Sequence, residues 1–94
     1  MPTAAHLLAA GPGHAAESAL ATVLSRGADP NAATAEDGGL TPLHVAAAWG
    51  QPANLRLLLL HGADPALLDS EGLLPRDLAE RDGHIDCLRL VSSD

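Results

Sequence analysis

The sequence is poor in the residues that build most protein cores. Its 94 residues include no phenylalanine, no tyrosine and no lysine, one tryptophan (Trp49) and one cysteine (Cys87). A single cysteine excludes a disulfide within the chain and fits a reducing compartment. The apolar residues make up 47% of the chain and are mostly alanine and leucine, which favour helices. The composition therefore predicts a small all-α domain.

Basic residues are also scarce. Twelve acidic residues against five arginines give a net charge of −7. A nucleic-acid-binding surface usually carries a basic stripe that displaces counterions, so this charge argues against DNA or RNA as a partner of this segment. The start of the sequence is a poor secretory signal, and no apolar run reaches the roughly 18 residues that cross a bilayer. We expect an intracellular protein, cytoplasmic or nuclear, that does not bind a membrane.

The chain contains a repeat. Gly-Ala-Asp-Pro occurs twice, at residues 27–30 and 62–65. Three pairs of landmarks lie 33 residues apart: Gly39 and Gly72, Pro42 and Pro75, Gly50 and Gly83. A period of this length indicates a solenoid of stacked units. We predict one domain over residues 1–94, with three units at about 3–30, 31–65 and 66–94.

Each unit is predicted to hold two short helices. In the middle unit Thr41 suits the N-cap, and Pro42 suits the first helical position, where its missing N–H costs nothing. This helix is expected to run to Trp49 and to stop at Gly50, because glycine favours the left-handed position after a helix. A second helix is expected over about 52–61. The aspartate of the Gly-Ala-Asp-Pro turn that follows is expected to bond its own backbone.

These features resemble the ankyrin repeat. The stretch Thr41-Pro42-Leu43-His44-Val45-Ala46 matches the signature T-P-L-H-x-A of that family. The third unit departs from the pattern at three positions: Leu74, Arg76 and Asp77. The resemblance implies an all-α stack of helix-turn-helix units that binds a protein partner, with no catalytic activity and no cofactor. We expect a monomer. The positions that the resemblance makes structural are Thr41, Pro42, Leu43, His44, Gly50, Gly62 and Gly83.

A narrower resemblance suggests an alternative function. The stretches LTPLHVAAAWG, GADPALLDSEGL and GHIDC are similar to the N-terminal ankyrin segment of the ankyrin-repeat and LEM-domain endonucleases. Those proteins join ankyrin repeats to a LEM domain and a GIY-YIG nuclease domain. This resemblance implies a regulatory or targeting segment of a DNA endonuclease whose catalytic region is absent from this chain. A third possibility is a degenerate remnant without a partner.

His44 comes three residues after the expected N-cap, from where a side chain can reach back to the cap. We interpret it as structural rather than catalytic. The resemblance gives the same interpretation, with the histidine tying neighbouring turns together. His6 is expected in this role in the first unit and Asp77 in the third, where a carboxylate also meets the positive end of the helix dipole.

Three possible metal ligands, His84, Asp86 and Cys87, fall close together on one short helix. A zinc site normally takes four ligands from two segments, and the sequence supplies no second pair. We therefore predict no metal site. Cys87 occupies an apolar position of the helix pattern and is interpreted as a buried thiol.

Similarity to the family places the partner-contacting positions on a concave face, made of the turn tips and the first helices. These positions are Asp37, Gly38, Leu40, Ala48 and Trp49 in the middle unit, and Ser70, Glu71, Leu73, Arg81 and Asp82 in the third. Trp49 is the expected anchor, since tryptophan is enriched at interface hot spots. The alternative is a tryptophan folded over a thin, alanine-rich core. The same pattern puts Leu57–Leu59 in the core and Leu60 at the surface.

Overall fold

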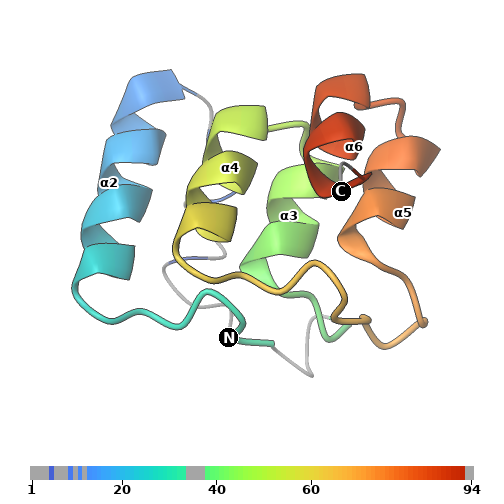
Figure 1. Cartoon of the computed structure of the whole chain (residues 1–94), viewed down its shortest axis with the longest axis horizontal. Coiled ribbons are helices and arrows are strands. Elements are labelled where there is room, and N and C mark those ends of the chain that lie inside the picture. Colours follow the sequence, from blue (N-terminus) through green and yellow to red (C-terminus); the bar gives the residue numbers. More distant parts are fainter. Residues whose placement is uncertain (1–4, 6–8, 10, 12, 34–37, 93–94) are drawn as a thin grey trace.

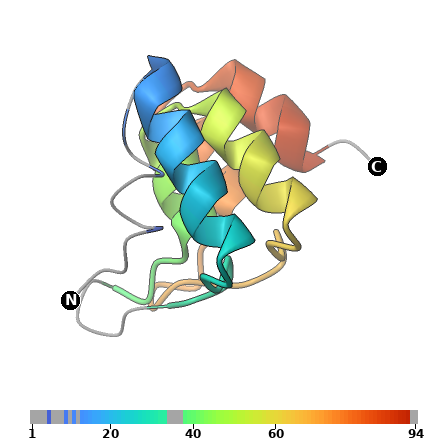
Figure 2. The same ribbon diagram turned by 90° about the vertical axis from the view of Figure 1, so that its left-hand side faces the viewer.

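The structure, a computed structural model, describes residues 5, 9, 11, 13–33 and 38–92. These residues contain five helices: α2 (Gly13–Ser25), α3 (Pro42–Ala48), α4 (Pro52–Leu60), α5 (Pro75–Arg81) and α6 (Ile85–Ser92). They form two layers, with α2, α4 and α6 side by side in one and α3 and α5 in the other (Figures 1 and 2). Because the pair α3–α4 packs against the pair α5–α6, the predicted all-α solenoid of helix-turn-helix units is confirmed. Two predicted positions, His6 and Asp37, lie outside the described residues.

The helices of the middle unit end one residue earlier than the sequence predicted. α3 ends at Ala48 and α4 at Leu60, so that Trp49 and His61 are C-caps rather than helical residues. Gly50 follows α3 with a φ of 67°, the left-handed conformation that glycine adopts without a steric penalty. The turn chemistry is as predicted. The side chains of Asp29 and Asp64 each accept a hydrogen bond from the backbone N–H two residues further on.

The core lies between the two layers and is built from leucine and small side chains. Four leucines are fully buried across the first two units: Leu20, Leu43, Leu55 and Leu58. Alanines such as Ala46, Ala47 and Ala79 are fully buried beside them. Cys87 is fully buried as well, which confirms its interpretation as a core thiol. Small side chains allow the helices to approach closely, which compensates for the scarcity of aromatic residues.

The run of four leucines in α4 is divided as predicted. Leu58 is fully buried, Leu57 and Leu59 are partly buried against the core, and Leu60 is 76% exposed. Successive residues of a helix point about 100° apart, so four consecutive side chains cannot share one face. Leu60 therefore contributes little to the core.

We expect Leu58→Ala to lower the free energy of unfolding by about 2–5 kcal/mol, because it leaves a cavity in a packed core. Leu60→Ala removes the same atoms from the surface and should change that free energy by no more than about 0.5 kcal/mol. Urea unfolding followed by circular dichroism measures both. Equal losses for the two variants would contradict the assignment of Leu60 to the surface.

Candidate protein-interaction site

His44 lies in the first turn of α3 with its side chain fully buried. Thr41 caps this helix: its Oγ1 accepts a hydrogen bond from the His44 N–H at 3.3 Å, and its own N–H donates to His44 Nδ1 at 3.2 Å. A backbone N–H can only donate, which assigns the ring proton to Nε2. Nε2 donates that proton to the carbonyl oxygen of Leu73 at 2.9 Å. His44 is therefore structural: it completes the capping box and holds the neighbouring turn.

Asp77 takes the place of His44 in the third unit, as predicted. Its Oδ2 accepts a hydrogen bond from the Leu74 N–H at 2.8 Å, at the N-terminal end of α5. The helix dipole favours a negative charge at that end. An ionised carboxylate has no proton to donate to a carbonyl of a further turn. Asp77 therefore caps its own helix without the second bond that the imidazole makes.

The pKa of His44 makes the stability of the stack depend on pH. Burial lowers this pKa from its ordinary value of 6.5, while the bond to Leu73 and the carboxylates of Asp69 and Asp77 partly offset the effect. The folded pKa lies below the unfolded one, so the unfolded chain binds the proton more readily. The stability that the neutral imidazole contributes is complete above about pH 6.5 and is lost as the pH falls towards the folded pKa.

We expect the urea concentration at the unfolding midpoint to decrease as the pH is lowered from 7.5 to 5. His44→Gln should weaken this pH dependence and lower the stability at pH 7.5. His61→Gln, at an exposed histidine, is the control and should keep the wild-type dependence. Circular dichroism at each pH measures the midpoints. A His44→Gln variant with the full wild-type pH dependence would remove His44 as the cause.

Two turn tips lie beside the base of α3 and α5. We call residues 38–40 the first tip and residues 69–73 the second tip. The Ser70 N–H donates to the Gly38 carbonyl oxygen at 2.8 Å, and a Cβ on Gly39 would lie 2.8 Å from Ser70 Oγ. Within the second tip, Asp69 Oδ1 accepts hydrogen bonds from the N–H groups of Glu71 and Leu73. The tips are thus held to each other and, through His44, to α3.

A hollow of about 200 Å³ opens between these tips and the two helices of the same layer. We call it the α3–α5 hollow. Its lining residues are Gly38, Leu40, Ala48, Asp69, Glu71, Leu73, Leu78 and Arg81. Leu78 is only 3% exposed. Six of the predicted partner-contacting positions meet here: Gly38, Leu40, Ala48, Glu71, Leu73 and Arg81.

Three of the predicted positions do not line the hollow. Ser70 holds the two tips together, and Trp49 and Asp82 cap the C-terminal ends of α3 and α5. The Trp49 side chain is 65% exposed, so it is not the cover of the core that the alternative interpretation required. Leu40 precedes α3 and Trp49 follows it, which separates them by the length of the helix.

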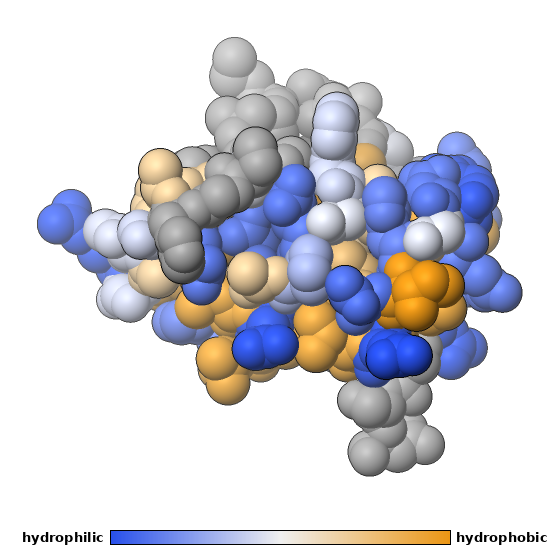
Figure 3. All heavy atoms as spheres, turned by 90° about the horizontal axis from the view of Figure 1, so that it is seen from above, coloured by the Kyte–Doolittle hydropathy of each residue, from blue (hydrophilic) through white to orange (hydrophobic). Residues whose placement is uncertain are grey.

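Exposed apolar side chains are scattered over the described part of the molecule. The large ones are Trp49, Leu60, Leu68 and Ile85, which come from four different segments. Seen from above, apolar groups alternate with hydrophilic ones (Figure 3). Two of these four residues are adjacent in sequence to residues that line the α3–α5 hollow: Trp49 follows Ala48, and Leu68 precedes Asp69.

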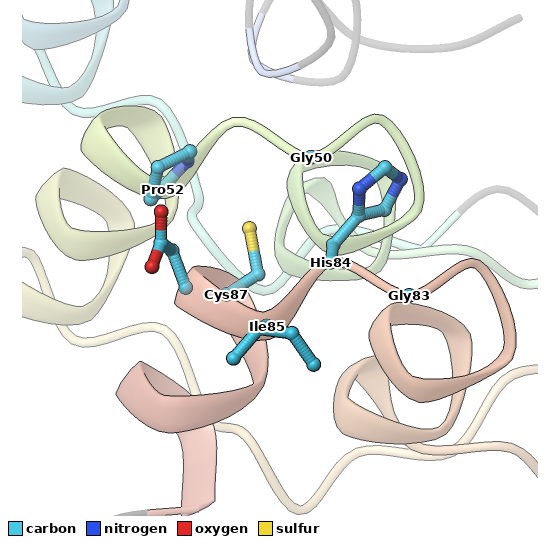
Figure 4. A pocket seen from close by; sticks show the side chains of 7 residues that line it. Gly50, Pro52, Gly83, His84, Ile85 and Cys87 are labelled. Carbon is cyan, nitrogen blue, oxygen red and sulfur yellow. The ribbon is translucent and has the colours of Figure 1, made fainter.

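A second hollow, of about 320 Å³, lies where the helices of each pair are joined (Figure 4). It is lined by Gly50, Pro52, Gly83, His84, Ile85, Asp86 and Cys87. His84 Nε2 is 3.1 Å from the Ala48 carbonyl oxygen, at the C-terminal end of α3, where helix carbonyls lack intrahelical partners. His84 therefore joins the third unit to the middle one, a role that the sequence analysis missed when it considered this residue only as a metal ligand.

The chemistry of the second hollow is inert. Burial, together with the Asp86 carboxylate, raises the pKa of the Cys87 thiol, so it stays protonated and is a poor nucleophile and metal ligand. Among the residues that the structure describes, no group of three or more His, Cys, Asp and Glu side chains is placed to hold a metal. Hence this hollow is a packing feature between two units.

Gly50 is required here for two reasons, which a pair of variants separates. A Cβ on Gly50 would lie 2.6 Å from His84 Nδ1, whereas a Cβ on Gly83, which has a similar positive φ, meets nothing within 4 Å. We expect Gly83→Ala to cost about 1–2 kcal/mol of stability. Gly50→Ala should cost at least about 1 kcal/mol more, because it also displaces His84 from the Ala48 carbonyl.

Urea unfolding measures both variants, and His84→Ala provides the control. In a His84→Ala background the cost of Gly50→Ala should fall to that of Gly83→Ala. An unchanged cost of Gly50→Ala in that background would show that contact with His84 is not the cause.

Comparison with known proteins identifies the class to which this architecture belongs. A family profile described as "Ankyrin repeats (many copies)" matches residues 23–79. The chain belongs to the ankyrin-repeat family, a general protein-interaction module that is typically non-catalytic. The narrower similarity to LEM-domain endonucleases stays a prediction. None of the helices in the described residues has the length and apolar character needed to cross a bilayer.

Curated relatives share the repeat region. The chain is 46% identical over 61 residues to the ARF GTPase-activating protein Git of Drosophila melanogaster, which is 65% of this chain and 8% of that protein. It is 47% identical over 62 residues to the ARF GTPase-activating protein GIT2 of Mus musculus, which is 66% of this chain and 9% of that protein. It is also 45% identical over 53 residues to the Espin-like protein of Homo sapiens, 56% of this chain and 5% of that protein. The chain therefore spans a small part of each of these proteins.

Proposed function

We propose that this ankyrin stack binds a protein partner in the α3–α5 hollow and catalyses no reaction. The single observation that carries the proposal is the convergence at this hollow. Six positions that the family resemblance marks for partner contact come from the two tips and from the ends of α3 and α5, and together they line one concavity. These positions are spread over residues 38 to 81 of the sequence, so it is the fold that brings them together.

The hollow suits an apolar side chain. Leu40 and Leu73 are half-buried on its walls, Leu78 lies beneath, and Ala48 is small enough to leave the space open. Apolar residues in such a concavity with a charged edge are the usual arrangement of a binding surface. The tips are already fixed by hydrogen bonds, so binding requires little ordering of the backbone.

Trp49 supplies a second contact in this proposal. Its exposed indole follows Ala48 directly, at the end of α3 that is distant from the tips. A partner segment that fills the hollow and continues along α3 reaches it. Tryptophan loses little side-chain entropy for the area it buries, which explains its enrichment at hot spots.

The proposal extends only the role of the repeat region to this chain. The GTPase-activating activity named for two relatives is not extended, because the match covers 8% and 9% of those proteins. The acidic charge of this chain remains the reason to expect a protein rather than a nucleic acid at the site.

We expect Ala48→Arg to abolish partner binding, because the new side chain fills the hollow. Trp49→Ala should weaken binding by about 2 kcal/mol, or about thirtyfold in dissociation constant. Both should keep the wild-type melting curve, since position 48 is not in the core and Trp49 is exposed. Quantitative pull-downs from a cell lysate identify the partner, and titration calorimetry then gives the dissociation constants.

Leu60→Glu, at an exposed position in the other helix layer, is the matched control and should capture the same proteins as the wild type. The proposal would be wrong if Ala48→Arg and Trp49→Ala capture the wild-type set undiminished while both variants remain folded.

A further inference from the structure

We infer that the α3–α5 hollow selects its partner segment by the order of its charges. The segment places an apolar side chain between Leu40 and Leu73, a basic side chain on the side of the tips, and an acidic side chain on the side of the helix ends. This inference rests on the proposed function and specifies the chemistry of the segment that the same hollow takes.

The charges that line the hollow lie at opposite ends of it. Asp69 and Glu71 belong to the second tip, directly before α5, and Arg81 is the last residue of α5. A helix of seven residues is about 10 Å long, so the acidic tip and the arginine are separated by about that distance. The hollow is therefore negative at one end and positive at the other.

Within the described part of the chain, Glu71 and Arg81 have only weak side-chain partners of their own. Glu71 is exposed, and Arg81 Nε is 3.8 Å from Asp82 Oδ1 with both side chains largely in solvent. Exposed ion pairs of this kind contribute little free energy, so Arg81 loses little when it leaves Asp82 to bind a carboxylate of a partner. Asp69 uses Oδ1 for two backbone N–H groups, which orients its carboxylate at the tip.

The apolar walls determine what lies between the charges. Leu40, Leu73 and Leu78 line the hollow, and a charged side chain placed among them would lose hydration without a partner there. The volume of about 200 Å³ is enough for a single apolar side chain. The central residue of the segment is therefore apolar, and the charged residues flank it.

The overall charge of the chain and the local charge order act differently. A net charge of −7 attracts any basic segment at long range. Arg81 repels basic groups at the end of the hollow that is distant from the tips. A segment with one basic and one acidic residue is therefore expected to bind in a single chain direction. The double variant Glu71→Lys/Arg81→Glu cancels the negative charge of the second tip, where Asp69 remains, and makes the end of α5 acidic. Its net charge stays −7, because the first change adds two positive units and the second removes two.

The test is selection of short random peptides displayed on phage against the wild-type chain, with Ala48→Arg as the counter-selection. We expect the enriched peptides to share an apolar residue with a basic residue on one side and an acidic residue on the other. A synthetic copy of one such peptide should bind the Glu71→Lys/Arg81→Glu variant about tenfold more weakly than the wild type. A second copy with its basic and acidic residues exchanged should prefer the double variant.

The possible results separate this inference from the proposed function. Peptides that depend on Ala48 but bind the wild type and the double variant equally would overturn the charge order and leave the proposed function standing. A selection that gives no difference between the wild type and Ala48→Arg, including no enrichment on either, would overturn both. Wild-type melting of all variants, checked by circular dichroism, excludes unfolding as the cause of lost binding.

Discussion

The buried imidazole of His44 is the constraint on which the α3–α5 hollow depends. Its Nδ1 accepts from the Thr41 N–H and its Nε2 donates to the Leu73 carbonyl oxygen, so one buried ring fixes the start of α3 and the second tip together. Only the neutral form of the ring makes both bonds, since protonated Nδ1 cannot accept. Leu73 lines the α3–α5 hollow, so the ring that caps α3 also positions one wall of the hollow.

The same kind of bond recurs at the other joints of the stack. Asn31 donates to the Gly62 carbonyl oxygen and accepts from the Asp64 N–H, which joins the turn after α2 to the turn after α4. Asn54 donates to the carbonyl oxygens of Ala9 and Gly11, and His84 pairs with that of Ala48. Apolar contacts between alanine-rich layers are not directional, whereas these bonds set the register of each unit on the next.

Much of the fold follows from local sequence signals, and the joints do not. The 33-residue period, the cap at Thr41 and the glycine after α3 predicted the two helices of the middle unit to within one residue, because each signal acts over a single turn. The exposure of Leu60 and Trp49 also followed from helix periodicity and family resemblance. The roles of Asn31, Asn54 and His84 could not be predicted, since each contacts a backbone group 31 to 45 residues away. Every residue has the same backbone carbonyl, so the sequence does not indicate which one a side chain will bond. One signal was overlooked: Asp69 followed by Gly72 is a type I turn pattern, and it marks the second tip.

The residues that define the repeat lie next to those that line the hollow, but the first group stabilises the fold and the second forms the surface. Leu40 precedes the capping residue Thr41, and Leu73 supplies its carbonyl oxygen to His44 while its side chain lines the hollow. Because the signature residues bond the backbone, the adjacent side chains can change without cost to the fold. In the third unit even two core positions of the repeat differ: Arg76 and Glu80 are exposed where the middle unit buries Leu43 and Ala47. The charged side chains at the ends of a stack and the apolar side chains in its hollow can therefore vary while the backbone of the repeat stays the same.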